Sequence, residues 1–265
     1  MPSISTKWAA PSLALLLLNA CSESSQPAMP DAQSIHRDAI TIDAHADIEL
    51  PGQPSSYVGS DGLSKVSPAK MRAGGLDAVV MSIAVGPKPR TAQGYAEARQ
   101  IAETELAAVQ ALVADTANNT ILATGPRALT DAHSQDQLAL ILGMQNALIL
   151  GSDPDYLDEL YGAGVRVFAL THMGHNDYAD SSRPLFNAAT GSREPDAEHG
   201  GLSELGIAAI RRINALGGIV DIAQLSRQAA LQAIDVSTSP VIASHSNVQA
   251  LTAVSRNLSD EEIDR

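Results

Sequence analysis

Side chains that could bind a metal ion follow the first apolar run of the chain. The segment Asp43-Ala44-His45-Ala46-Asp47 places His45 and Asp47 two residues apart, so an extended backbone turns both to the same side. An imidazole and a carboxylate in this arrangement can bind one divalent ion together. The same spacing also occurs where both side chains only hydrogen-bond a loop, so this motif leaves both interpretations open.

Further polar groups close or directly follow later apolar runs, and they are Gln145, His172, Gln224 and His245. In a parallel α/β barrel, functional groups lie at the C-terminal ends of the strands. We therefore expect these side chains to open into one mouth together with the His-x-Asp pair. Their convergence favours a metal-assisted hydrolase, in which a metal ion polarises a carbonyl group and activates water.

The remaining histidines lack this placement at strand ends. We expect His36 and His133 to be solvated. His175 and His199 belong to segments that we expect to form loops near the mouth.

The elements that must position these groups are short apolar runs alternating with longer helical patterns, which is typical of repeated βα units around a parallel sheet. The expected strands cover residues 39–42, 76–84, 120–123, 138–144, 165–170, 218–222 and 241–243. The expected helices cover residues 92–117, 153–162, 202–216, 227–234 and 247–254. This order predicts an α/β domain with repeated βα units around a parallel sheet.

Length and charge limit the other possibilities. A chain of 265 residues is long enough for one barrel domain, since such domains run to roughly 200–250 residues. The formal net charge of −13 argues against nucleic acid or anionic lipid headgroups as partners. The single cysteine excludes an internal disulfide and a Cys-rich zinc site.

The N-terminal segment resembles a secretory signal. Lys7 precedes an apolar run at residues 13–18, which is followed by small residues. The segment Leu18-Asn19-Ala20-Cys21 resembles the lipobox of bacterial lipoproteins, although an ordinary signal peptide with an incidental cysteine stays open. We predict a signal peptide over residues 1–20, a tether lipidated at Cys21 over 21–33, and a hydrolase domain over 34–265, in the cell envelope and facing the periplasm or the outside.

The C-terminal segment starts another helix. Ser259-Asp260-Glu261-Glu262 fits a capping box, yet the chain stops at Arg265. We therefore expect the last βα unit of the barrel to be missing from this chain; the alternative is that this segment is a polar tail.

Several motifs in order resemble the membrane (renal) dipeptidase family of metallopeptidases. Besides the His-x-Asp segment they are Leu170-Thr171-His172 with Tyr178-Ala179-Asp180, Gly200-Gly201-Leu202-Ser203, 220–226 (VDIAQLS), 240–246 (PVIASHS) and Arg256-Asn257. The resemblance covers nearly all of the chain after the tether. It implies a (β/α)8 barrel with two zinc ions that hydrolyses dipeptides, often with a D-residue on the C-terminal side.

The resemblance also implies roles for single residues. His45 and Asp47 match ligands of the first metal ion, and His245 matches a ligand of the second. His172 matches the catalytic histidine that contacts the substrate and the tetrahedral intermediate. Arg256 matches the arginine that holds the substrate carboxylate, a task suited to a bidentate guanidinium.

The sequence departs from the family pattern at three places. The bridging glutamate falls on Gln145, one histidine ligand of the second metal falls on Gln224, and an acidic residue near the eighth strand would lie beyond Arg265. A neutral amide is a poorer ligand for a divalent ion than a carboxylate. We therefore expect the second site to be weak or empty.

The leading hypothesis is a lipid-anchored dipeptidase that binds one or two zinc ions. Its expected partners are a dipeptide substrate and the membrane, and a homodimer is left open. The first alternative is a peptide-binding envelope lipoprotein that has lost catalysis on the same scaffold, as the two glutamines suggest. The second is another barrel amidohydrolase, such as a deaminase, but those commonly open with His-x-His, whereas position 47 is Asp.

Overall fold

The computed structural model describes residues 31–50, 52–53 and 55–265. The predicted signal peptide, Cys21 and most of the predicted tether lie outside these residues. Among the helices in the described ranges, none is both long enough and apolar enough to cross a membrane.

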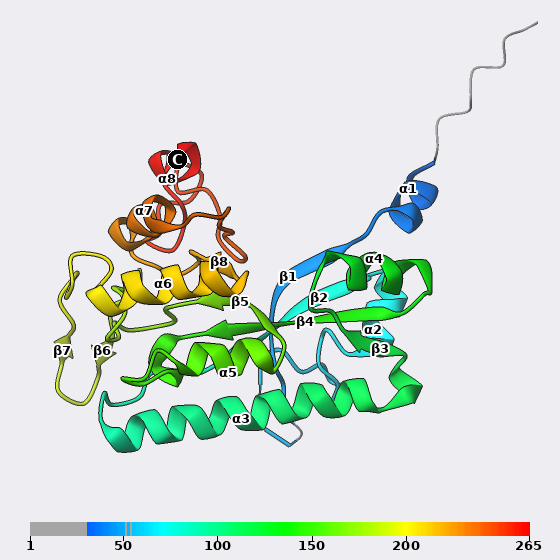
Figure 1. The fold of residues 1–265 in the computed structure, drawn as a ribbon, viewed down its shortest axis with the longest axis horizontal. Coiled ribbons are helices and arrows are strands. Elements are labelled where there is room, and N and C mark those ends of the chain that lie inside the picture. The colour runs from blue at the N-terminus through cyan, green and yellow to red at the C-terminus, as the bar shows by residue number, and fades with distance from the viewer. Residues whose placement is uncertain (1–30, 51, 54) are drawn as a thin grey trace, which may run out of the picture.

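The centre of the fold is a six-stranded parallel sheet in the order β1-β2-β4-β5-β8, with β3 also paired to β4 (Figure 1). Ala139 of β4 pairs with Ala78 of β2 and with Ile121 of β3, so β2 occupies one side of β4. On the other side of β4, β3 pairs with residues 138–140 and β5 pairs with residues 142–145. The strands are β1 (Ile42–Asp47), β2 (Ala78–Ala84), β3 (Thr120–Leu122), β4 (Leu138–Gln145), β5 (Val165–Ala169) and β8 (Ile219–Asp221).

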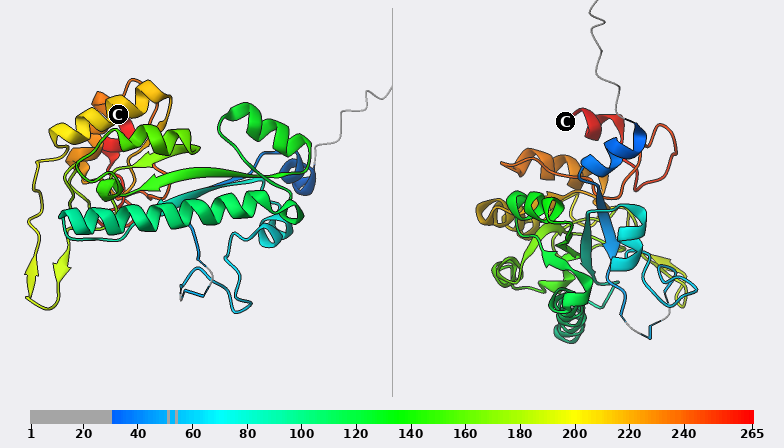
Figure 2. Two further views of the ribbon diagram at one scale, coloured as in Figure 1. Left: turned by 60° about the horizontal axis from the view of Figure 1, so that its bottom comes forward. Right: turned by 90° about the vertical axis from the view of Figure 1, so that its right-hand side faces the viewer.

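Helices pack against the strands of the sheet, and helices that are consecutive in the C-terminal half of the chain also pack against one another. The long helix α3 lies along the sheet, while α5 packs on α6, α6 on α7 and α7 on α8 (Figures 1 and 2). The antiparallel hairpin β6–β7 (Phe186–Asn187 and Ser192–Arg193) projects from one end. The helices are α1 (Ala32–Asp38), α2 (Pro68–Gly74), α3 (Ala92–Ala114), α4 (Pro126–Ser134), α5 (Tyr156–Gly162), α6 (Glu204–Leu216), α7 (Arg227–Val236) and α8 (Asp260–Asp264), with short 3-10 turns at Thr116–Asn118 and Ala147–Ile149.

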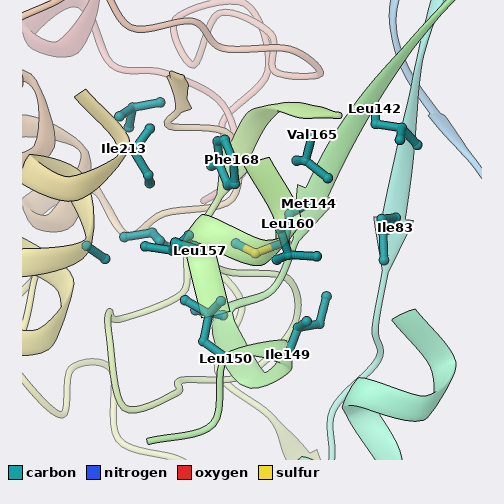
Figure 3. Close-up of a cluster of buried hydrophobic side chains, with 14 of the residues drawn as sticks. Ile83, Leu142, Met144, Ile149, Leu150, Leu157, Leu160, Val165, Phe168 and Ile213 are labelled. Carbon is teal, nitrogen blue, oxygen red and sulfur yellow. The ribbon is translucent and has the colours of Figure 1, made fainter. Parts of the chain in front are cut away.

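The core lies between the sheet and these helices. Strands β2 and β4 are buried along almost their whole length, because their apolar runs have no polar alternation and both faces are covered. Phe168, Leu142 and Met144 meet side chains from α5 and α6 in this core (Figure 3). The strands that carry the site therefore pack against a buried apolar core.

The parallel α/β architecture follows the sequence prediction, and five of the seven expected strands form at the expected residues. The first begins at Ile42 and continues to Asp47, so His45 and Asp47 belong to the strand itself. The expected strand at 241–243 contributes a single bridge, between Ile242 and Asp221. Over the described residues the sheet is open between this bridge and β1 and forms part of a barrel; the missing last unit stays a prediction.

Two C-terminal segments test the helix predictions. The predicted helix at 247–254 is wrong: Val248 forms a parallel bridge with Leu258 instead. Leu251 is 80% exposed, so this segment has no core to bury the apolar face of a helix. The capping box is confirmed, because Ser259 Oγ accepts from the Glu262 amide while the Glu262 carboxylate accepts from the Ser259 amide.

Candidate active site

A cavity of about 280 Å³ opens at the C-terminal ends of the strands. It is lined by all seven residues of the described chain that the sequence singles out: His45, Asp47, Gln145, His172, Gln224, His245 and Arg256. They come from β1, from the end of β4 and from loops that follow β5, β8 and the bridge at Ile242. Parallel strands end at the same edge of the sheet, and this is why groups 200 residues apart meet here.

The side chains of His45 and Asp47, both on β1, lie next to each other in the cavity. The distance from His45 Nε2 to Asp47 Oδ1 is 3.4 Å, and Ser82 Oγ lies 3.0 Å from His45 Nδ1. The hydrogen bond with His45 holds the pKa of Asp47 below its ordinary value, against the opposing effect of burial. An ionised carboxylate and an imidazole nitrogen at this separation are a suitable pair of ligands for one divalent ion.

His245 is held in one tautomer by a chain of hydrogen bonds. Ser244 Oγ donates its only proton to Asp221 Oδ2 and therefore accepts from His245 Nδ1, 2.7 Å away. The lone pair of His245 then lies on Nε2, which accepts from Gln224 Nε2 at 2.9 Å and from Gln145 Nε2 at 3.2 Å. Burial lowers the pKa of His245 to about 3, so the ring is neutral.

The two expected metal-binding groups are in direct contact. The rings of His45 and His245 stack with their centroids 3.9 Å apart and an interplanar angle of 20°.

Gln224 has a φ of 66°, a left-handed conformation that is uncommon for a residue other than glycine. Its Oε1 is buried and has no hydrogen-bond partner among the described residues.

His172 and Arg256 complete the cavity. Burial lowers the pKa of His172 despite the attraction of Asp47, and its Nδ1 is buried without a partner in the described chain. Arg256 donates to the backbone oxygen of His245 at 3.2 Å, and burial lowers its pKa too. The site thus holds a neutral imidazole and a half-buried guanidinium on the same cavity wall.

The donor set fits one divalent ion and does not fit a carboxylate-bridged pair. No three His, Cys, Asp or Glu side chains within the described ranges lie close enough together to hold a metal. His45 and Asp47 offer two ligands for one ion, one fewer than the three protein ligands of a usual catalytic zinc site; water or substrate would complete the coordination. Around His245 the neighbouring groups are the neutral amides of Gln145 and Gln224, which supply no negative charge.

Five cavity residues were missed by the sequence analysis: Tyr57, Ser64, Lys65, Val66 and Arg183. They lie in irregular segments after β1 and β5, where no periodic pattern marks a side chain as facing the site. The one local signal is that Arg183 directly follows the polar segment Asp180-Ser181-Ser182, which turns out to be buried.

The other histidines lie outside the cavity wall. The prediction that His133 is solvated is wrong, because its Nδ1 lies 2.8 Å from Asp77 Oδ1 and the pair is half-buried. His36 is exposed, as expected. His175 and His199 lie in loops, where His175 Nδ1 accepts from the Ser181 amide and His199 Nε2 donates to the Asn176 carbonyl oxygen.

A family model extends the comparison from single residues to the whole described domain. The model of the membrane dipeptidase family (Peptidase family M19) matches residues 29–265. The chain belongs to this family. Metallopeptidases of the membrane dipeptidase type are hydrolases.

Individual relatives agree with the family. Dipeptidase aclJ of Aspergillus oryzae is 36% identical over 129 residues, which are 49% of this chain and 28% of that protein. The probable dipeptidase PvdM from Pseudomonas aeruginosa is similar in structure, with 34% identity and a TM-score of 0.78 over 88% of this chain and 58% of the other. A metallo peptidase from Rhodobacter sphaeroides, solved with a phosphinate mimic of L-Ala-D-Ala, shares the fold with a TM-score of 0.68 at 19% identity. The matches therefore span less than two thirds of aclJ and of PvdM.

Proposed function

We propose that the protein is a metal-dependent dipeptidase that works with one divalent ion, zinc in the first instance. The observation that carries this proposal is the meeting of His45, Asp47, His172 and Arg256 in one cavity. A volume of about 280 Å³ lies near the lower end of ligand pockets, about 300–1,000 Å³, and suits a ligand of dipeptide size. The similarity to named dipeptidases supports the same substrate class.

The residues divide the work by their chemistry. His45 and Asp47 would hold the ion, which when bound polarises the peptide carbonyl and activates water. Arg256 would pair with the substrate carboxylate through two parallel N–H groups. His172 is neutral, because burial lowers its pKa, and its ring N–H would donate to the oxygen that gains negative charge.

The test is hydrolysis of paired L,L and L,D dipeptides by the purified chain supplemented with zinc. We expect His172→Ala to lower kcat by about 100-fold or more, the usual cost of losing one hydrogen-bond donor to an oxyanion. His36→Ala is the matched control, because His36 is exposed on α1. Metal analysis should give one zinc ion per chain, and two tightly bound ions would contradict the one-ion proposal.

A second candidate function is a peptide-binding protein without turnover. It is favoured by the two amides that donate to His245 Nε2, since these hydrogen bonds occupy the lone pair needed for a second metal ion. Calorimetric binding of dipeptides without hydrolysis would support this alternative. The double variant Gln145→Glu, Gln224→His should then raise the zinc content and restore hydrolysis.

The location of the protein is a separate proposal. We propose a cell-envelope lipoprotein, anchored through Cys21 and free to form a homodimer. Labelling of cells with a radioactive fatty acid should mark the wild-type chain and should not mark Cys21→Ser. Equal labelling of both proteins would contradict lipidation at Cys21.

A further inference from the structure

Three cationic side chains line the cavity, and among the described residues none of them is within ion-pair distance of a carboxylate. They are Lys65, Arg183 and Arg256. The carboxylates of the cavity are Asp43, which accepts from the His45 amide, and Asp47, which pairs with the His45 ring. The cavity lining therefore has three cationic side chains against two carboxylates, a positive balance in a chain whose net charge is −13.

Hydrogen bonds to the backbone of two site residues, His172 and Gln224, fix the segment that carries Arg183. Ser181 Oγ donates to the carbonyl oxygen of His172 at 2.6 Å, and the Ser182 amide donates to that of Gln224 at 2.9 Å. The Arg183 amide donates to Ser181 Oγ at 3.1 Å, and its carbonyl oxygen accepts from Gly174. Ser181 and Ser182 are buried, whereas Arg183 is exposed and reaches the cavity wall.

The side chains of Arg183 and Arg256 line the same cavity. After burial, Arg183 is the next cause that lowers the pKa of Arg256, and its charge also lowers the pKa of His172. Most other cations of the described surface lie beside carboxylates, as in the pairs Arg90–Glu198 and Arg212–Asp158. Two unpaired guanidiniums beside one small cavity form a site for two negative charges.

We propose that Arg183, supported by Lys65, forms a second anion subsite beside Arg256, and that the preferred substrates are dipeptides with an acidic side chain. This inference rests on the proposed dipeptidase function. Arg256 binds the terminal carboxylate, and Arg183 binds the side-chain carboxylate. Lys65 lies 5.8 Å from the ring centre of Tyr57, on the loop that borders the same cavity.

The test compares dipeptides that differ only in charge: Ala-Asp with Ala-Asn, and Asp-Ala with Asn-Ala. For the full chain with zinc we expect kcat/KM to favour the acidic member of at least one pair by about fivefold, the upper effect of an exposed ion pair. The preference should decrease with added salt, because exposed charges are screened. Arg183→Gln should remove most of the preference through KM, and Arg183→Lys should keep part of it.

Arg211→Gln is the matched control, since Arg211 is exposed on α6 and also lies beyond 4 Å of any described carboxylate. Turnover with equal kcat/KM for both members of each pair would overturn the subsite and leave the dipeptidase function intact. Calorimetry of the same peptides tests binding independently of turnover. Tighter binding of the acidic member without hydrolysis would support the anion subsite and contradict the proposed dipeptidase function. Absence of both binding and turnover overturns both proposals.

Discussion

Glu105 is a buried carboxyl group behind the active site, and its removal should change how stability depends on pH. It lies on α3, is 8% exposed, and its Oε2 accepts from the Ala84 amide at 2.8 Å, at the end of β2. Burial raises its pKa from 4.5 to about 8, and repulsion by Asp47 and Glu49 adds to the shift. We expect Glu105→Gln to stabilise the protein at alkaline pH.

The sign follows from proton binding. Between pH 4.5 and about 8 the folded state keeps a proton on Glu105 that the unfolded state has released, so stability falls as pH rises through this window. One pKa unit corresponds to about 1.4 kcal/mol, and the full shift gives an upper value of about 5 kcal/mol. Local rearrangement relieves part of this penalty, so we expect the variant to gain about 3 kcal/mol near pH 8.5.

The assay is thermal unfolding with a chelator present, at about pH 4 and about pH 8.5. A gain of about 3 kcal/mol raises Tm by roughly 6–12 °C for a domain of this size. Near pH 4 both proteins should unfold at similar temperatures, because the glutamate is protonated in both states. Glu103→Gln, an exposed site on the same helix, is the control. A difference between wild type and Glu105→Gln that does not change with pH would refute the reasoning.

Two further predictions concern the support of the site. Gly206→Ala on α6 would bring a Cβ to 2.1 Å from the Tyr178 carbonyl oxygen and should lower the free energy of unfolding by about 1–3 kcal/mol. Gly74→Ala, with open space around its Cβ, should leave stability equal or higher in the same denaturant titration; similar losses in both variants would contradict the steric argument. Ser244→Ala removes the acceptor for His245 Nδ1, so ring-nitrogen NMR should change from one tautomer to a mixture, and an unchanged spectrum would rule out the proposed hydrogen-bond chain.

Much of the framework was predictable because it depends on local patterns. The apolar runs at residues 76–84 and 138–144 predict strands of a parallel sheet, and the structure has them as β2 and β4. The capping box at Ser259 needs only four consecutive residues, and it forms as predicted. The predicted helix at 247–254 failed for the opposite reason: its apolar residues are spaced correctly, but Leu251 and Val254 meet no core among the described residues.

The sequence by itself determined which groups stand at the strand ends, since His45, Asp47, Gln145 and His245 each follow or close an apolar run. Only the tertiary structure decided how these groups meet. The stacking of His45 on His245, the two amides that donate to His245 Nε2, and the position of Arg183 all join segments far apart in the chain. Such contacts depend on strand pairing and on loop paths, which local side-chain periodicity does not encode.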